Sequence, residues 1–180
     1  MKVLETVLTD ALVLEPRVFV DDRGFFLESY NERVFAELGV TQKFVQDNHS
    51  YSRKSVLRGL HYQVQKPQGK LVRVVSGEIL DILVDLRRSS PTFGRWHGVN
   101  LSSENRRLAW IPEGFAHGFY VLSDGAHVAY KSTEFYFPEF ERTILWNDPQ
   151  LNIAWGDIPD PQLSTKDRKG VLFKNAELFP

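Results

Sequence analysis

The fold is indicated most clearly by the stretch Glu78-Ile79-Leu80-Asp81-Ile82-Leu83-Val84-Asp85-Leu86. Apolar residues occupy every second position from Leu80 to Leu86, while Asp81 and Asp85 fall between them. Because successive side chains of a β-strand point to opposite faces, this alternation predicts a strand with two chemically different faces.

Further strand signals lie on both sides of this run, at roughly the ten-residue spacing that is typical of a sandwich or barrel. Besides 78–86, the predicted strands are residues 17–20, 25–30, 44–52, 56–63, 70–75, 98–101, 107–111, 118–122 and 127–133. The first two are separated by a turn at 21–24. A chain with this many short strands is predicted to be all-β, an antiparallel jelly roll with a few short helices.

One early helix is predicted between Asn31, which is a good N-cap, and Gly39, which is a good stop signal. Val34, Phe35 and Leu38 form its apolar stripe.

The length of 180 residues predicts a single domain over residues 1–180. From about residue 147 onward, Pro149, Pro159 and Pro161 predict an irregular C-terminal tail that wraps the body.

Composition excludes several classes of protein. A formal net charge of -1 argues against nucleic acid as a partner, because no excess of Lys or Arg could neutralise phosphates. The absence of cysteine excludes a disulfide scaffold, a thiolate zinc site and a cysteine nucleophile. Neither a signal-peptide core nor a membrane-length apolar run is found, so we expect a cytoplasmic protein without membrane contact.

Polar residues inside predicted strands point to a functional site, because they are costly if buried without partners. Gln46 and Asn48 share one strand face. Arg58 and His61 are three positions apart on the next strand, so a regular strand would point them to opposite faces. If both face one cavity, a β-bulge near Gly59 is required.

Other candidate residues are ambiguous when each is taken alone. His61 could be a base or a buried structural histidine, and Lys70 could be a solvated strand end. His117 lies at a loop-to-strand junction, Tyr130 in a late strand, and Lys166-Asp167 in the tail, where a charged pair would ordinarily be a surface feature.

Known catalytic motifs are missing. No His-x-His pair is present, so His61 and His117 do not predict a metal site, and His49, His97 and His127 are expected to be structural or on the surface. The sequence has no Gly-x-Ser-x-Gly elbow, phosphate-binding loop or dinucleotide fingerprint.

Several motifs, taken in order, resemble the dTDP-4-dehydrorhamnose 3,5-epimerase family. They are Asp22-Arg23-Gly24-Phe25-Phe26-x-Glu28, Phe44-Val45-Gln46-Asp47-Asn48-His49-Ser50, Leu57-Arg58-Gly59-Leu60-His61-Tyr62-Gln63, Gly69-Lys70-Leu71-Val72-Arg73, Ser90-Pro91-Thr92-Phe93-Gly94, Ile111-Pro112-x-Gly114-Phe115-Ala116-His117-Gly118-Phe119 and Trp146-Asn147-Asp148-Pro149. The resemblance runs from about residue 16 to residue 167. It implies a cupin-type jelly roll, a homodimer, and a cofactor-free epimerase of a dTDP-4-keto-6-deoxyhexose in dTDP-L-rhamnose synthesis.

The resemblance also implies roles for individual residues. His61 looks like the base, Asp167 its orienting partner, Tyr130 the acid on the opposite face, and Lys70 the cation near the developing enolate. The positions that look like substrate-binding positions are Arg23, Glu28, Gln46, Asp47, Asn48, Arg58, Lys70, His117, Glu141 and Lys166. In a dimer, part of that set can come from the neighbouring subunit.

These residue types suit the chemistry independently of the resemblance. A proton next to a ketone is acidic because the carbanion becomes an enolate, and a lysine ammonium stabilises the enolate oxygen without a metal. Neutral imidazole, with an ordinary pKa of about 6.5, accepts a proton at neutral pH. Inversion then requires a donor on the other face, and a tyrosine with an ordinary pKa of about 10 remains protonated.

Three alternatives stay open at the level of the sequence. The chain could be a single-site epimerase acting on C3 or C5 of a related dTDP-keto sugar, a non-catalytic sugar-binding jelly roll, or a metal-dependent enzyme. Thr143 and Trp155-Gly156 depart from the pattern of the family, but neither position carries a proposed catalytic role.

Overall fold

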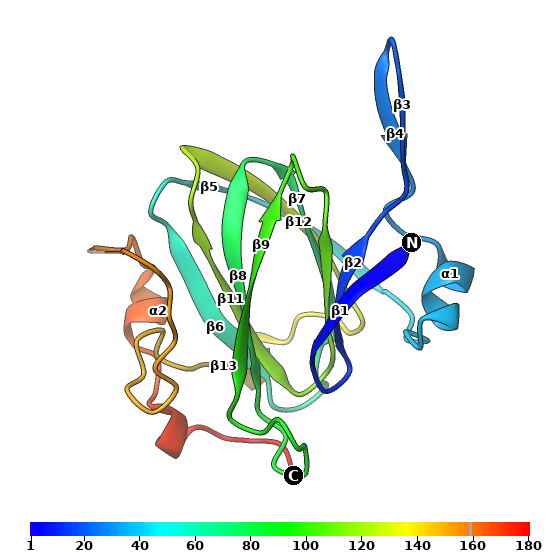
Figure 1. Ribbon diagram of the computed structural model, residues 1–180. Helices are drawn as coiled ribbons and strands as arrows, with labels where there is room; N and C mark the ends of the chain where they lie inside the picture. The colour runs from blue at the N-terminus through cyan, green and yellow to red at the C-terminus, as the bar shows by residue number, and fades with distance from the viewer. Residues whose placement is uncertain (159) are drawn as a thin grey trace.

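Two antiparallel sheets face each other in the computed structural model, which describes residues 1–158 and 160–180 (Figure 1). The six-stranded sheet has the order β1 (Lys2–Leu8), β2 (Ala11–Glu15), β10 (Leu108–Ile111), β7 (Lys70–Ser76), β12 (Gly125–Ser132) and β5 (Gln46–Arg53). The five-stranded sheet has the order β13 (Glu141–Thr143), β6 (Leu57–Gln63), β11 (Phe115–Val121), β8 (Glu78–Asp85) and β9 (Trp96–Ser102). The predicted antiparallel jelly roll is confirmed.

The alternating run that predicted the fold forms β8, between β11 and the edge strand β9 of the five-stranded sheet. Its inner face carries Ile79 and Leu83, which pack against apolar residues of the six-stranded sheet in the core between the sheets. Its outer face carries Ile82 and Val84, which are covered by residues of the C-terminal tail. Asp81 lies on the inner face and is 0% exposed.

The helix α1 (Glu32–Glu37) begins where the sequence predicted. The Asn31 side chain accepts hydrogen bonds from the backbone N–H groups of Arg33 and Val34, and Gly39 has a positive φ of 86° after the last turn. Phe35 is buried in a cluster with residues of β2, β7 and β10. The helix therefore covers part of the outer face of the six-stranded sheet.

The strands β3 (Val18–Asp21) and β4 (Gly24–Leu27) form a hairpin that extends away from the body, as Figure 1 shows. Val20 is 76% exposed and Phe26 is 69% exposed. The predicted strand over residues 25–30 was wrong after Leu27. Tyr30 instead turns toward α1 and packs against Phe35, with 5.2 Å between the ring centroids.

Three strands, β1, β2 and β13, were not predicted from the sequence. The pairing of β1 with β2 shifts register twice within seven residues, and such irregularities interrupt the alternation that marks a strand. β13 has only three residues, all partly buried, which is too short for a pattern.

The C-terminal tail contains the short helix α2 (Thr165–Arg168) and the 3-10 turn η2 (Phe173–Asn175). Another 3-10 turn, η1 (Pro138–Phe140), lies before the tail, directly ahead of β13. Isolated bridges attach it to the body, including Val56 with Gln162 and Ile144 with Val171. Pro159, one of the prolines behind the prediction of an irregular tail, lies outside the described residues. That the whole chain is one domain stays a prediction.

Candidate active site between the two sheets

A cavity of about 340 Å³ opens between the two sheets and is lined mostly by polar side chains. Its lining comprises Gln46, Asn48, Ser50, Arg58, His61, Gln68, Lys70, His117, Gly118, Phe119, Tyr130, Ser132, Tyr136, Glu141 and Lys166. The structure thus brings together most of the residues that the sequence singled out, from strands of both sheets and from the tail.

The predicted bulge near Gly59 is confirmed. Between β6 and β11, His61 pairs with His117 and Arg58 pairs with Phe119, so two residues of β6 face one residue of β11. Gly59 has a φ of 121°, and a Cβ there would lie 2.5 Å from the Cα of Gly118. Only glycine fits this close approach, and the extra residue lets Arg58 and His61 line the same cavity.

His61 and Asp167 form a hydrogen-bonded dyad. The Nε2–H of His61 donates to Oδ1 of Asp167 at 2.6 Å, because an ionised carboxylate can only accept. Within the described part of the chain Nδ1 of His61 has no partner, and the ring lines the cavity. Burial lowers the pKa of His61, and the nearby charges of Lys166 and Lys70 lower it further, which outweighs the opposing effect of Asp167. The imidazole is therefore neutral at pH 7 and can accept a proton.

Asp167 is itself held firmly by the start of α2. The Ser164 hydroxyl donates to Oδ2 of Asp167 at 2.7 Å, and the Asp167 backbone N–H donates to the same hydroxyl at 3.1 Å. Burial raises the pKa of Asp167, but hydrogen bonds from His61 and Ser164 dominate and lower it. The carboxylate stays charged and fixes the orientation of the His61 ring.

Lys70, on β7, is only 8% exposed and makes no direct ion pair with a carboxylate of the described residues. Burial lowers its pKa to about 8, while the charges of Glu141 and Asp81 oppose this shift. At neutral pH it is therefore mostly cationic, with its ammonium free to bind an anionic oxygen.

Tyr130 projects into the cavity from β12, in the sheet that faces the strand of His61. Burial raises the pKa of its phenol, the charge of Arg58 lowers it, and the charge of Glu141 raises it. The net shift is upward, so the phenol keeps its proton at neutral pH. A proton acceptor and a proton donor therefore stand on opposite walls of one cavity.

A second histidine–carboxylate pair lies deeper in the cavity. His117 donates from Nε2 to Oδ1 of Asp81 at 2.7 Å. His117 pairs directly with His61 across the two strands, so the two imidazoles are neighbours in the sheet.

Charged and polar groups at the mouth of the cavity are linked to one another. Lys166 Nζ and the Tyr136 hydroxyl donate to the two oxygens of Glu141, at 2.8 and 2.9 Å. Burial raises the pKa of Glu141, but these hydrogen bonds and the nearby positive charges lower it below its usual value. On the other wall, Gln46 Nε2 donates to Asn48 Oδ1 at 2.9 Å, which confirms that both lie on one face.

Four predicted site residues do not line this cavity. Asp167 lies behind the His61 ring as its hydrogen-bond partner. Asp47 points to the outer face of its sheet and pairs with Lys131 at 2.9 Å. Arg23 and Glu28 belong to the region of the protruding hairpin, where the Arg23 side chain is 89% exposed and pairs with Asp21.

Six lining residues were missed by the sequence analysis: Ser50, Gln68, Gly118, Phe119, Ser132 and Tyr136. Strand alternation could have found two of them, because Ser50 follows Asn48 by two positions and Ser132 follows Tyr130 by two. Tyr136 lies in the segment after β12, where no periodic signal exists.

Within residues 1–158 and 160–180, no group of three or more His, Cys, Asp or Glu residues is placed to hold a metal ion. Likewise, none of the helices in these ranges has the length and apolar character needed to cross a membrane. Two of the histidines expected to be structural or on the surface, His49 and His127, form an exposed pair 3.0 Å apart.

Comparison with known proteins gives consistent results. The family model described as dTDP-4-dehydrorhamnose 3,5-epimerase matches residues 5–175. A dTDP-4-dehydrorhamnose 3,5-epimerase of Pseudomonas aeruginosa is 58% identical, over 100% of both chains.

Solved structures extend the similarity to three dimensions. The 3,5-epimerase of Legionella pneumophila, in complex with dTDP-4-keto-L-rhamnose, is 51% identical with a TM-score of 0.95, covering 98% of this chain and 94% of that one. The enzyme of Bacillus anthracis with TDP and pyrophosphate bound is 51% identical with a TM-score of 0.92, covering 95% and 98%. Both sequence and structure therefore show that this chain belongs to the dTDP-4-dehydrorhamnose 3,5-epimerase family.

Proposed function

We propose that this chain inverts C3 and C5 of dTDP-4-dehydro-6-deoxy-D-glucose to give dTDP-4-dehydro-L-rhamnose, in the synthesis of dTDP-L-rhamnose. The observation that carries the proposal is the placement of His61 and Tyr130 on opposite walls of one cavity, with the ammonium of Lys70 beside them. The substrates and products named for the related proteins agree with it.

His61 removes the proton next to the ketone. Its neutral imidazole presents Nδ1 to the cavity, while Asp167 holds the other ring nitrogen and stabilises the imidazolium that forms. As the C–H bond breaks, its electron pair moves to the ketone oxygen and produces an enolate.

Lys70 stabilises that enolate. Because the ammonium is buried and has no carboxylate directly against it among the described residues, its charge is available to the developing oxyanion. Electrostatic stabilisation of this kind is commonly worth a factor of about 10² to 10³ in rate.

Tyr130 completes the inversion by donating its phenolic proton to the opposite face of the same carbon. The enolate electron pair forms the new C–H bond and the tyrosine becomes a phenolate. Between the two inversions, His61 must lose a proton and Tyr130 must regain one. The same pair of residues can then act on the second carbon.

The other polar groups of the cavity suit the binding of a nucleotide diphosphate and its sugar. Arg58 donates from Nε to Ser52 Oγ at 2.9 Å and from one terminal nitrogen to the Tyr51 carbonyl at 3.3 Å, so its remaining guanidinium N–H groups are oriented for phosphate oxygens. The remaining residues assigned to substrate binding within the cavity are Gln46, Asn48, His117, Glu141 and Lys166.

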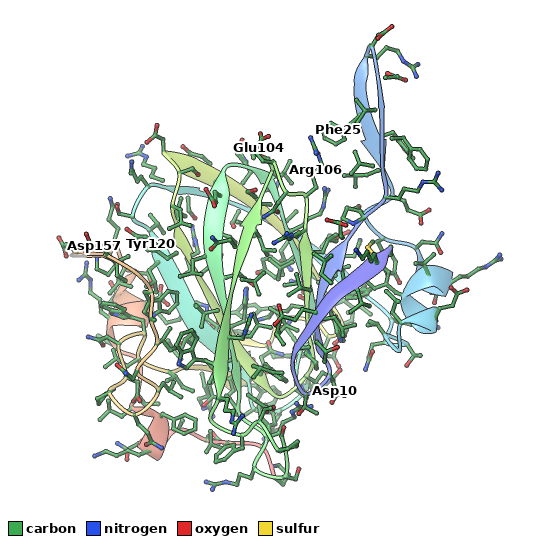
Figure 2. All side chains as sticks on the ribbon, viewed as in Figure 1. Asp10, Phe25, Glu104, Arg106, Tyr120 and Asp157 are labelled. Atoms are coloured by element: carbon green, nitrogen blue, oxygen red, sulfur yellow. The ribbon has the colours of Figure 1, made fainter. Side chains whose placement is uncertain are left out.

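A homodimer accounts for the residues that lie outside the cavity. The protruding hairpin exposes Phe25 and Phe26, and such an apolar surface requires a partner. Figure 2 shows Phe25 on the hairpin near Arg106 of the body. The two form a cation–π contact, with the guanidinium carbon of Arg106 4.5 Å from the centroid of the Phe25 ring. We place Arg23 and Glu28 of each hairpin at the cavity of the other subunit, with Asp47 on the sheet face between the subunits. A cytoplasmic location stays a prediction.

The proposed activity is tested by NMR of the dTDP-4-keto sugar with the purified protein in deuterated water, coupled to a ketoreductase that traps the product. Deuterium at both C3 and C5 of an L-rhamnose product is expected. Exchange at one carbon would instead establish a single-site epimerase, and no exchange would establish a binding protein. Loss of exchange after thorough chelation, restored by metal, would establish a metal-dependent enzyme.

The hairpin arrangement is tested by mixing two impaired variants, Arg23→Ala and His61→Asn, under conditions that exchange subunits. If each hairpin serves the other subunit, a mixed dimer has one cavity with both native residues, and about one quarter of the native activity returns. If the hairpin serves its own cavity, mixing restores no activity.

A further inference from the structure

Residues 134–137 form an irregular segment between β12 and η1, and we call it the wall segment because its Tyr136 lines the cavity. Neither a helix nor a strand includes any of these four residues. Their backbone groups therefore depend on partners other than a strand ladder or a helical turn. Phe135 is 54% exposed and Tyr136 is 49% exposed, so packing alone does not fix the segment.

Glutamine side chains bind one backbone group of each residue in the wall segment. Gln68, which follows β6 in the chain, donates from Nε2 to the carbonyl of Glu134 at 2.9 Å. Gln46, at the start of β5, accepts on Oε1 from the backbone N–H of Tyr136 at 3.1 Å. Both of these glutamines also line the cavity. The third, Gln63, does not line it and holds the other two residues.

Gln63, the last residue of β6, is 3% exposed and binds the wall segment at two points. Its Nε2 donates to the carbonyl of Phe135 at 3.2 Å and to that of Lys66 at 2.8 Å. Its Oε1 accepts from the backbone N–H of Phe137 at 2.8 Å. Exchanging the amide oxygen and nitrogen would place oxygen against oxygen and N–H against N–H, so the partners fix this orientation. The residues on both sides of Tyr136 are therefore attached to one buried amide.

Between these two anchors, Tyr136 reaches the mouth of the cavity. Its hydroxyl donates to Oε2 of Glu141 at 2.9 Å, and Lys166 donates to the other oxygen at 2.8 Å. Gln63 pairs directly with Glu141 in the register of β6 and β13. The residue that anchors the wall segment and the residue that receives the Tyr136 hydroxyl are thus neighbours in one sheet. This arrangement fixes Tyr136 at its backbone and at its hydroxyl.

Asn105 provides a contrast, because its amide also binds three backbone groups but in a loop away from the cavity. Oδ1 accepts from the N–H groups of Ser102 and Arg107, at 3.1 and 3.0 Å. Nδ2 donates to the carbonyl of Asn100 at 2.9 Å. Neither Asn105 nor these partners line the cavity, so this amide only closes the turn between β9 and β10. Gln63 differs because the segment it holds carries a cavity residue.

We propose that Gln63 is a positioning residue for the epimerase reaction, which sets the place of Tyr136 at the cavity and thereby the fit of the sugar nucleotide. It acts through Tyr136, since its own side chain does not line the cavity. Its effect on the substrate rests on the proposed function, whereas its hold on Tyr136 is a property of the protein alone. His61, Lys70 and Tyr130 lie outside the wall segment, so loss of Gln63 weakens substrate binding and leaves proton transfer in place.

The hold on Tyr136 is measured without substrate, by fluorine NMR of protein labelled with 3-fluorotyrosine. The Tyr136 signal is assigned by its loss in Tyr136→Phe. Gln63→Met keeps the length of the side chain and removes its three hydrogen bonds, so we expect the signal to move toward that of free fluorotyrosine. In Asn105→Leu, which removes three hydrogen bonds elsewhere, the signal is expected to stay in place. The same signal in Gln63→Met and in the native protein would overturn the proposal.

A second variant covers the case in which Gln63→Met does not fold. Gln63→Glu keeps the acceptor for the backbone N–H of Phe137 and loses both donors, so it loosens the wall segment at Phe135. The same displacement of the Tyr136 signal is expected, and its absence in a folded Gln63→Glu would count against the proposal equally.

Steady-state kinetics with the dTDP-4-keto sugar provides the second measurement. In Gln63→Met we expect KM to rise about tenfold with kcat nearly unchanged, as when binding shared by the ground and transition states is lost. In Asn105→Leu both constants should stay native, although Tm falls by a similar amount. A fall in kcat at unchanged KM would mean that the change acts through His61, two residues away on the same strand, and would overturn the proposal.

A double-mutant cycle shows whether Gln63 acts through Tyr136. Tyr136→Ala removes the side chain that is positioned, so adding Gln63→Met should raise KM no further. Effects on KM that multiply would show that the two residues act independently, and the proposal would be wrong. If the fluorine signal moves in Gln63→Met but the native protein shows no epimerisation, the proposed function fails while the hold on Tyr136 stands. If the native protein is active and the signal moves without a change in KM, the role in substrate binding is wrong.

Discussion

The cavity contains two histidine–aspartate pairs that differ in how the carboxylate is supported. Asp167 comes from the tail, 106 residues after His61, and Ser164 donates to its second oxygen at 2.7 Å. Asp81 comes from a strand next to that of His117, and its second oxygen has no partner among the described residues. The two hydrogen bonds are nearly equal in length, at 2.6 and 2.7 Å.

The difference shows that a histidine–aspartate distance alone does not define a catalytic base. At His61 the carboxylate is stabilised by a further donor, Ser164, and the ring lines the same cavity as Tyr130. At His117 the carboxylate retains a buried oxygen without a partner among the described residues. We therefore assign proton abstraction to the first pair and substrate binding to His117 of the second.

Replacing each histidine in turn should give the largest difference in turnover between the two pairs. His61→Asn removes the proton acceptor, and we expect turnover to fall by about 10³-fold or more with the fold intact. His117→Asn keeps the acceptor, and we expect about a tenfold loss, seen mainly as a higher KM. Steady-state kinetics with circular dichroism as the control for folding will show this, and equal losses of kcat in the two variants would contradict the assignment.

Tyr130→Phe separates abstraction from donation. Since His61 remains in place, exchange of substrate protons with deuterated water should continue, while formation of inverted product should fall by about 10²-fold. Both are read from one NMR time course. Unchanged product formation would exclude Tyr130 as the sole donor.

The pH dependence of kcat/KM tests the roles of His61 and Lys70 in the native protein, without mutation. Burial lowers the pKa of His61 below its ordinary value of 6.5, so the fraction of neutral base falls only as the pH drops below that value. Lys70 loses its charge as the pH rises through about 8. We expect a bell-shaped profile that falls about tenfold per pH unit beyond each limb. A profile that stays flat up to pH 10 would remove Lys70 from the mechanism.

Ser164→Ala tests the support of the first pair and should have the smallest effect. It removes the N-cap of α2 and the donor to Asp167 Oδ2, so α2 should lose about 1 kcal/mol and kcat should fall by a few fold. Thermal unfolding and kcat measure the two effects. A loss as large as that of His61→Asn would mean that Ser164 takes part in the chemistry directly.

Local patterns in the sequence predicted much of this structure. Alternation in residues 78–86 predicted the strand β8, and Asn31 with Gly39 predicted the helix boundaries. The three-residue spacing of Arg58 and His61 predicted a bulge at Gly59, because two side chains of a regular strand at that spacing cannot enter one cavity. β1 and β2 could not be predicted in this way because their bulges interrupt the alternation.

The sequence by itself determined most of the strands, the boundaries of the early helix, and most of the site residues through their ordered resemblance to a family. Only the tertiary structure decided which carboxylate supports which histidine, that Asp81 contacts His117 from the core, and that Arg23 lies away from the cavity of its own chain. The physical reason is the separation along the sequence of the residues that interact. Alternation and capping depend on residues within a few positions of each other, whereas the charge at Lys70 depends on groups from β8, β13 and α2 that only folding brings together.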